Sequence, residues 1–133
     1  MPRKSKKKEI DDWIEFQEKR GRRFTPLVRN TCNEDGKKIN IHFASPIEKG
    51  SNKGKFWFGI ICDQLSDMDD FVFICGKTED YYEIPCVELK KYEMWKHKQN
   101  PLCSFLIDKE SHTYLLNKKE HEDIEKFSAR SVD

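Results

Sequence analysis

The chain has 133 residues and a formal net charge of +1, with 37% charged and 36% hydrophobic residues. This length predicts one domain, because domains commonly hold about 100 to 150 residues. The sequence has no apolar run of the roughly 18 residues that cross a membrane, and its lysine-rich start lacks the apolar segment of a secretory signal, so we expect no membrane contact and a location in the reducing cytoplasm.

The chain begins with a basic segment that leads into a helix. Residues 1–8 carry five Lys or Arg and no hydrophobic residue after the initiator, so they predict a flexible basic arm ahead of a single domain over residues 9–133. From Glu9 to Arg20, apolar residues recur every three or four positions, which predicts a helix that Gly21 ends.

Four strands are expected after this helix, because aromatic and β-branched residues recur there between polar breaks. Asp35-Gly36 predicts a tight turn just before the first of them. The short spacer between the last two strands favours a hairpin. The expected strands are Ile39–Ala44, Lys55–Cys62, Phe71–Cys75 and Tyr81–Ile84.

The second half of the chain completes the predicted fold. Pro85 suits the first turn of a helix, so we expect a helix over Cys86–Lys98. A second hairpin of Leu102–Ile107 and His112–Leu116 follows, and then a charged helix over Lys118–Ala129. The predicted class is α+β, with a largely antiparallel sheet of about five to six strands and N-terminal, middle and C-terminal helices in the order αββββαββα.

The large aromatic residues are expected to fill the core, because the chain has few aliphatic residues. Trp57 and Trp95 lie in apolar surroundings, so we predict that both are buried rather than stacked on nucleic-acid bases. The cysteines show neither CxxC nor Cys/His spacing, so we predict buried thiols and no metal or cofactor. The cysteines are Cys32, Cys62, Cys75, Cys86 and Cys103.

Positive charge is concentrated near the N-terminus. Residues 1–30 contain ten Lys or Arg and five Asp or Glu, so the remainder of the chain is slightly negative. Such a region can neutralise the phosphates of DNA or RNA, although a solubilising tail has the same composition. The predicted nucleic-acid-binding residues are Arg20, Arg22, Arg23 and Arg29, with Lys49 and Lys53 in the loop over residues 45–54.

One residue set predicts a different function. Glu88-Leu89-Lys90 is an acid-x-Lys triplet, and Asp69 or Asp70 lies upstream of it. In a metal-dependent nuclease, Asp70 and Glu88 would hold Mg²⁺ and Lys90 would orient the attacking water. The triplet follows Pro85, however, and is expected on an exposed helix rather than on the strand that such a site needs.

The aromatic middle of the chain contains three segments, KFWF at 55–58, DFVFI at 70–74 and YYEIP at 81–85. These segments resemble the second half of small restriction-endonuclease-like domains of the PD-(D/E)xK type. In that family the preceding strand carries a catalytic ExK or QxK, whereas the matching Ile39–Ala44 has neither an acid nor a lysine. The resemblance therefore implies DNA association more than cleavage, with an active site that is lost or rebuilt around Glu34, Asp35 and His42.

Three classes of function follow from these observations. We favour a nucleic-acid-associated, DNA-binding module without catalytic chemistry of its own, for which binding should depend strongly on salt. The first alternative is the Mg²⁺-dependent nuclease, which requires acids and a lysine in one cleft. The second alternative is a protein-interaction or accessory domain with a protein partner, which requires an exposed apolar patch.

Overall fold

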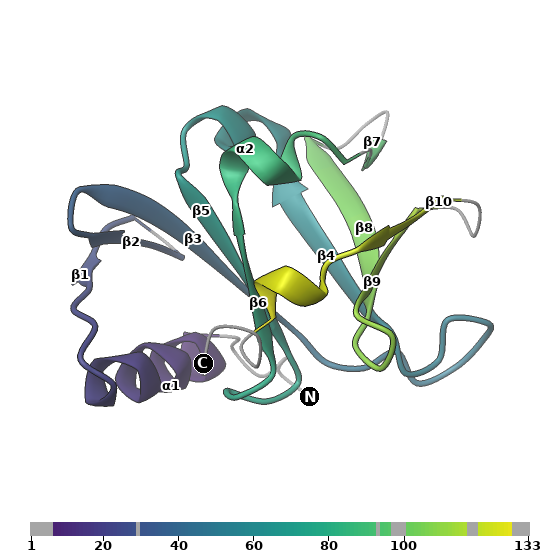
Figure 1. Cartoon of the computed structure of the whole chain (residues 1–133), viewed down its shortest axis with the longest axis horizontal. Helices are drawn as coiled ribbons and strands as arrows, with labels where there is room; N and C mark the ends of the chain where they lie inside the picture. Colours follow the sequence, from purple (N-terminus) through teal and green to yellow (C-terminus); the bar gives the residue numbers. More distant parts are fainter. Residues whose placement is uncertain (1–6, 29, 93, 97–100, 117–119, 129–133) are drawn as a thin grey trace.

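The structure is a computed structural model that describes residues 7–28, 30–92, 94–96, 101–116 and 120–128. Figure 1 shows the first helix at one end of the long axis and the loop between β3 and β4 at the other. The elements in chain order are α1 (Lys7–Lys19), β1 (Thr25–Pro26), β2 (Thr31–Glu34), β3 (Lys37–Ala44), β4 (Phe56–Ile61), η1 (Cys62–Ser66), β5 (Asp70–Cys75), β6 (Tyr81–Pro85), α2 (Cys86–Leu89), β7 (Trp95–Lys96), β8 (Leu102–Asp108), β9 (Thr113–Leu116), β10 (Glu120–Asp123) and η2 (Glu125–Phe127).

The strands divide between two five-stranded sheets. The first sheet has the order β1-β2-β3-β5-β6, and the second has the order β10-β9-β8-β4, with β7 also paired to β8. Every strand pair is antiparallel except β3 and β5, because the chain crosses into the second sheet as β4 between them. The α+β class is confirmed, whereas the expected single sheet is replaced by two.

The helix α1 packs on one face of the first sheet. Ile10 and Trp13 of α1 are buried against Ile39, Ile41 and neighbouring residues of the sheet. The helix forms because its apolar residues recur at helical spacing, and it ends where Gly21 adopts a φ of +98°, a conformation that glycine allows at little cost. The predicted helix is confirmed, but it begins at Lys7, inside the segment predicted as a flexible arm; residues 1–6 lie outside the described part of the chain.

The other face of the first sheet packs on the second sheet, and aromatic rings fill the space between them. The ring centroid of Phe73 on β5 lies 5.0 Å from that of Phe58 on β4 and 5.0 Å from that of Phe105 on β8. All three residues are 2% exposed or less. The expected aromatic core is therefore confirmed, and it joins the two sheets.

Three predicted local features are confirmed. Asp35 and Gly36 have φ of +51° and +84°, as a tight turn between β2 and β3 requires. β5 pairs with β6, and β8 pairs with β9, as the two predicted hairpins. These features depend on neighbours in the sequence, so local residue patterns suffice to predict them.

The middle helix begins at Cys86 as predicted, but it is much shorter than the expected Cys86–Lys98. The middle helix α2 ends at Leu89, because Tyr92, Met94 and Trp95 pack against the core, and Trp95 pairs with Ser104 as part of β7. This burial outweighs the local helical preference of the segment.

The charged C-terminal segment also forms a strand where a helix was expected. Residues Glu120–Asp123 pair with β9 as β10, and only a single turn, η2, follows. Hydrogen bonding to β9 gives the backbone of this segment partners that its sequence pattern does not reveal. Residues 117–119 and 129 of the predicted helix lie outside the described part of the chain.

The prediction that Trp57 is buried is wrong, because its side chain is 40% exposed. On β4 the side chains of Phe56, Phe58 and Ile60 face the core, so alternation places Trp57 on the opposite face. Trp95, the other predicted core tryptophan, is half-buried and contacts the core.

The prediction of five thiols is wrong for one pair, because Cys62 and Cys103 form a disulfide. Cys103 opposes Ile60 in the register of β4 and β8, which brings the two cysteine Cα atoms to 5.5 Å. Cys32, Cys75 and Cys86 are buried thiols, as predicted. Burial raises the pKa of the Cys75 thiol, so it stays protonated at neutral pH.

No helix within the described residues has the length and apolar character that crossing a membrane requires.

Candidate nucleic-acid interface

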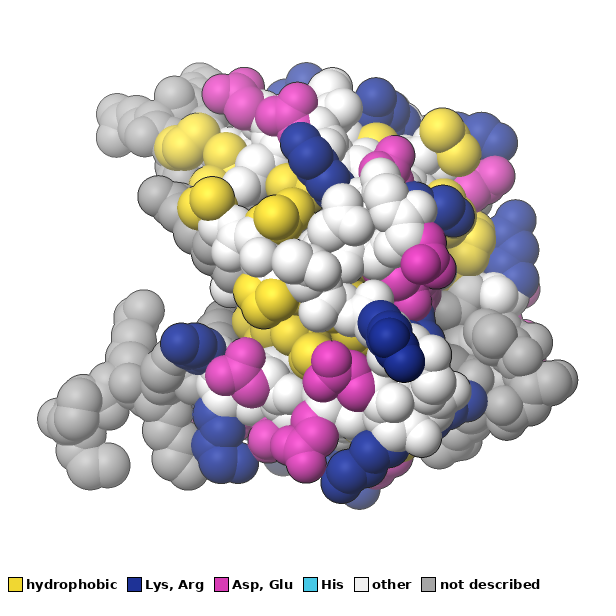
Figure 2. Space-filling model, turned by 90° about the vertical axis from the view of Figure 1, so that its left-hand side faces the viewer, with side chains coloured by type: hydrophobic (Ala, Val, Ile, Leu, Met, Phe, Trp, Pro, Cys, Tyr) yellow, Lys and Arg dark blue, Asp and Glu magenta, His cyan; other side chains and the backbone are white. Residues whose placement is uncertain are grey.

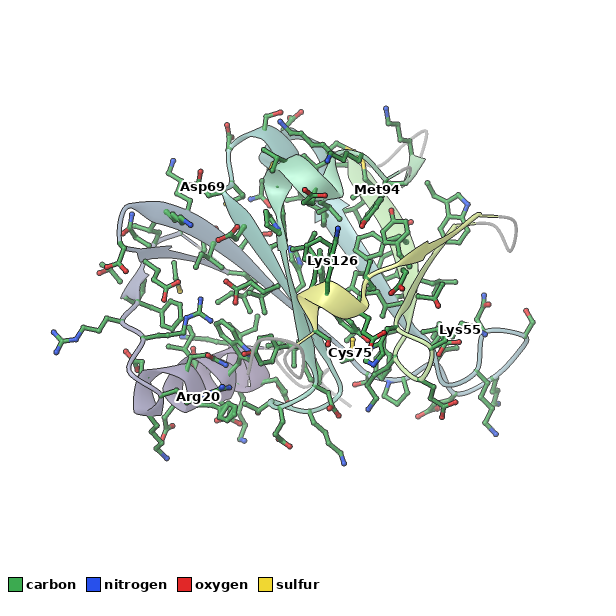
Figure 3. The ribbon with its side chains drawn as sticks, viewed as in Figure 1. Arg20, Lys55, Asp69, Cys75, Met94 and Lys126 are labelled. Carbon is green, nitrogen blue, oxygen red and sulfur yellow. A yellow bond between two sulfur atoms is a disulfide. The ribbon has the colours of Figure 1, made fainter. Side chains whose placement is uncertain are left out.

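An open cavity of about 520 Å³ lies where α1, the start of β3, the β5–β6 hairpin and η2 meet. Figure 3 shows two of its residues, Arg20 beside α1 and Lys126 on η2. Most of the lining side chains are charged or aromatic. They are Gln17, Arg20, Arg22, Lys37, Asp70, Tyr81, Glu83, Pro85, Lys126 and Phe127.

Arg22 lines this cavity and bridges two carboxylates. Its Nε and Nη2 donate to Glu34 at 2.7 Å each, and its Nη1 and Nη2 donate to Glu83 at 2.9 and 3.1 Å. Nη1 also donates to Gln17 Oε1 at 3.3 Å. These contacts use the five N–H donors of a guanidinium, so Arg22 holds the walls of the cavity together.

The surroundings of Arg22 favour its charged form. The guanidinium lies 5.0 Å from the ring centroid of Phe24 and 5.5 Å from that of Trp13. The hydrogen bond to Glu34 is the main cause that raises the pKa of Arg22, with Glu83 adding to it against the opposing effect of burial. The sequence produces this geometry because Gly21 ends α1 and turns the chain back toward the sheet.

Gln17 links Arg22 to the sheet. It is a buried polar residue on the apolar face of α1, with 2% of its surface exposed. Its Nε2 donates to the Tyr81 hydroxyl at 3.0 Å, while its Oε1 accepts from Arg22. Both ends of the amide are thereby satisfied, as a buried polar group requires.

Three further cations reach the cavity from segments far apart in the sequence. Arg20 follows α1, Lys37 begins β3 and Lys126 lies on η2. The Arg20 guanidinium lies 5.5 Å from the Phe16 ring centroid, and the Lys126 ammonium lies 5.0 Å from that of Phe127. The fold therefore collects positive charge that is dispersed along the chain.

Asp70 is the carboxylate of the cavity that Arg22 does not bond. Burial is the main cause that raises its pKa, and the nearby charge of Glu83 adds to this effect, whereas Lys37 opposes it. Its surroundings thus disfavour a negative charge at this position.

The structure separates the residues predicted to bind nucleic acid. Arg20 and Arg22 line the cavity, and Arg23 is exposed next to them, whereas Arg29 lies outside the described residues. The remaining two, Lys49 and Lys53, are exposed in the loop before β4. Figures 1 and 3 place this loop and Lys55 toward the end of the long axis opposite Arg20.

Lys37 and Lys126 complete the set of cations, and neither was predicted from the sequence. Lys37 directly follows the Asp35-Gly36 turn, so its place at the start of a strand was predictable. The position of that strand beside the cavity was not. Lys126 was assigned to a helix that does not form. No local signal shows that η2 packs beside β6.

The residues proposed for a nuclease do not gather in one place. Asp70 lines the cavity of Arg22, whereas Lys90 lines a different cavity with Tyr92 and Met94. Glu88 pairs with Lys91 at 3.4 Å. The described residues contain no group of three or more His, Cys, Asp or Glu side chains arranged to hold a metal ion.

The alternative acidic site around Glu34, Asp35 and His42 is also dispersed. Glu34 bonds Arg22, Asp35 occupies the exposed turn, and His42 hydrogen-bonds Asn40 on the face toward the second sheet. These three side chains therefore serve different parts of the fold.

The surface around α1 mixes both signs of charge. Residues 7–28 contain six Lys or Arg and five Asp or Glu, so most of the excess predicted for residues 1–30 lies outside the described part. Figure 2 shows acidic and basic side chains interspersed over α1, below a hollow with a hydrophobic floor. The cavity of Arg22, rather than the helix surface, is where the described cations converge.

Comparisons of this chain with protein-family models, with curated proteins and with solved structures gave no match. The resemblance to restriction-endonuclease-like domains stays a prediction that rests on its three segments. Function has to be argued from the cavity itself.

Proposed function

We propose that the protein associates with nucleic acid by holding the phosphate backbone at the cavity lined by Arg20, Lys37 and Lys126. The observation that carries the proposal is the convergence of these three cations, from three separate elements, on one open cavity. Cations arranged in this way suit a polyanion whose charges repeat along a strand. The proposal includes no catalytic step.

The contacts of Arg22 support this function. Arg22 offsets the charges of Glu34 and Glu83, which would otherwise repel phosphate from the same surface. Its donors are used internally, so phosphate contacts fall to the cations at the cavity rim. Contacts of this kind position nucleic acid without reading its sequence, so we expect little sequence preference.

The nuclease alternative has weaker support at this cavity. Asp70 and Glu83 lie on adjacent strands, but both oxygens of Glu83 accept hydrogen bonds from Arg22. Metal coordination by Glu83 would require breaking these bonds, which would leave two N–H donors of a half-buried guanidinium without acceptors. We therefore favour binding over cleavage.

The experiment is a titration of a labelled DNA duplex with the full-length chain at two salt concentrations. Lys37→Ala/Lys126→Ala should weaken binding and lower the slope of log K against log salt by about 0.9 for each phosphate that the variant no longer neutralises. The matched control, Lys49→Ala/Lys53→Ala, removes the same charge from the distant loop and should leave the slope nearly unchanged. Equal weakening in both variants would refute the cavity as the binding surface, and binding insensitive to salt would refute the function.

A further inference from the structure

The cavity of Arg22 has an exposed, cationic rim and a half-buried floor. The three cations proposed to hold phosphate are exposed, whereas Asp70, Pro85 and Phe127 line the cavity as half-buried residues, hereafter the cavity floor. The volume of about 520 Å³ lies within the range of roughly 300 to 1,000 Å³ that is typical of small-molecule pockets. A duplex keeps its bases paired inside, so it can touch the rim but cannot fill the cavity floor.

Asp70 gives the cavity floor a hydrogen-bond acceptor that the chain leaves unused. Arg22 bonds Glu34 and Glu83, and no described residue donates a hydrogen bond to the Asp70 carboxylate. An ionised carboxylate only accepts hydrogen bonds, so it suits a ligand that presents N–H groups. Each base of DNA and RNA carries at least one N–H donor on its Watson–Crick edge, and that edge is open only when the base is unpaired.

Phe127 gives the cavity floor an aromatic surface next to a rim cation. It packs against the aromatic core, and the Lys126 ammonium lies 5.0 Å from its ring centroid. Because Lys126 is exposed, its side chain can turn to a phosphate and leave the ring to the attached base. Stacking on an aromatic ring favours single strands, since their bases are free to leave their neighbours.

We propose that the cavity takes an unpaired nucleotide of a single strand, with the base on Phe127, its Watson–Crick edge toward Asp70 and the phosphates at the rim. The inference rests on the proposed function and names its substrate class, which is single-stranded rather than duplex nucleic acid. Charge sets the orientation, because the rim cations attract phosphate and the Asp70 carboxylate repels it. Every base has a ring face and an N–H donor, so this mode agrees with little sequence preference.

The first measurement compares a labelled single-stranded DNA oligonucleotide with the blunt duplex of the same sequence, each titrated with the full-length chain at two salt concentrations. Charge density alone would favour the duplex. We expect the single strand to bind roughly tenfold more tightly, because only its bases can reach the cavity floor. Equal or tighter binding of the duplex, with the expected salt dependence, would overturn this inference and leave the proposed function intact. Binding of neither DNA, or binding insensitive to salt, would refute both.

The second measurement tests the stacking contact. Phe127→Leu keeps an apolar side chain against the core but removes the ring, so it should weaken single-strand binding by roughly tenfold and leave the salt slope unchanged. Phe127→Trp should restore the affinity. The matched control is Phe16→Leu, since Phe16 also lies beside a cation, Arg20, but is not among the residues that line the cavity. Equal affinities of the two leucine variants would overturn the base contact.

The third measurement isolates the acceptor of Asp70. Asp70→Asn and Asp70→Ala remove the same negative charge, but only asparagine keeps a side-chain oxygen that can accept an N–H group. The alanine variant should therefore bind the single strand roughly fivefold more weakly than the asparagine variant, whereas the two should bind the duplex alike. Equal affinities of the two variants for the single strand would refute the contact between Asp70 and a base.

Discussion

The two sheets differ in how fully their polar groups are paired within the chain. At the first sheet, Arg22, Glu34 and Glu83 lie less than about one third exposed, and each donor of the guanidinium has an acceptor. At the second sheet, the terminal strand β4 pairs on one side only, with β8, among the described residues. The chain therefore pairs the polar groups of the first region by itself, whereas the backbone groups on the outer side of β4 need solvent or a partner.

The two regions also differ in what holds them together. The first sheet is covered on both faces, by α1 and by the aromatic core. The second sheet is tied by the Cys62–Cys103 disulfide next to its unpaired strand. Stability of the β4 side should therefore depend on a covalent link, and that of the α1 side on a network of charges.

The largest effect is expected from the disulfide. Cys62→Ala/Cys103→Ala should lower the free energy of unfolding by about 4 kcal/mol, because the bond closes a loop across 41 residues of sequence separation. Urea unfolding in the absence of reductant measures this decrease. When both proteins are unfolded in a reducing buffer, the difference between their unfolding free energies should disappear. Equal stability of the two proteins without reductant would show that the β4 side does not need the link.

Arg22 should give the next largest effect. Arg22→Ala leaves Glu34 and Glu83 without their partner in a half-buried site, which should cost about 3 kcal/mol of unfolding free energy. The matched control is Arg23→Ala, since Arg23 is exposed and should change stability by less than about 0.5 kcal/mol. Chemical denaturation compares the two variants, and similar small decreases in both would contradict a bracing role for Arg22.

Gly59 offers a smaller test on β4. Gly59→Ala places a Cβ against the Trp57 ring and should destabilise the fold by about 1 kcal/mol, because the ring must move. In a Trp57→Ala background the same change should be neutral or stabilising, since alanine suits a strand interior better than glycine. A double-mutant cycle of unfolding free energies measures this coupling. Additive effects would mean that the ring does not rest on Gly59.

The parts of the fold that depend on neighbouring residues in the sequence were predictable. The Asp35-Gly36 turn, the end of α1 at Gly21 and both hairpins depend on adjacent residues, and all are present. The division into two sheets is different, because a strand of the β4 type can pair with β3 or β8 without any change in its own pattern. Sequence alternation predicts two faces for such a strand, but not which face another sheet will cover.

The site was less predictable than the fold for the same reason. Arg22 was predicted to bind nucleic acid, and it does line the candidate cavity, but its hydrogen-bond partners Glu34 and Glu83 lie 12 and 61 residues away in the sequence. No spacing rule connects an arginine with carboxylates at those distances. Lys37 and Lys126 likewise reach the cavity through tertiary contacts that only the assembled sheets create.

The smallest expected effect concerns Asp70, the carboxylate that Arg22 does not bond. Burial raises the pKa of Asp70 above that of an unfolded aspartate, so the folded state binds the proton more tightly. Its contribution to stability is then present at acid pH and falls as pH rises from the unfolded pKa through the folded pKa. Asp70→Asn removes this titration, so the variant should be slightly more stable than the unaltered chain at neutral pH, with the gain shrinking on acidification. Thermal unfolding from acid to neutral pH measures the difference, and a variant less stable at neutral pH would indicate that the Asp70 charge supports the Arg22 side of the molecule.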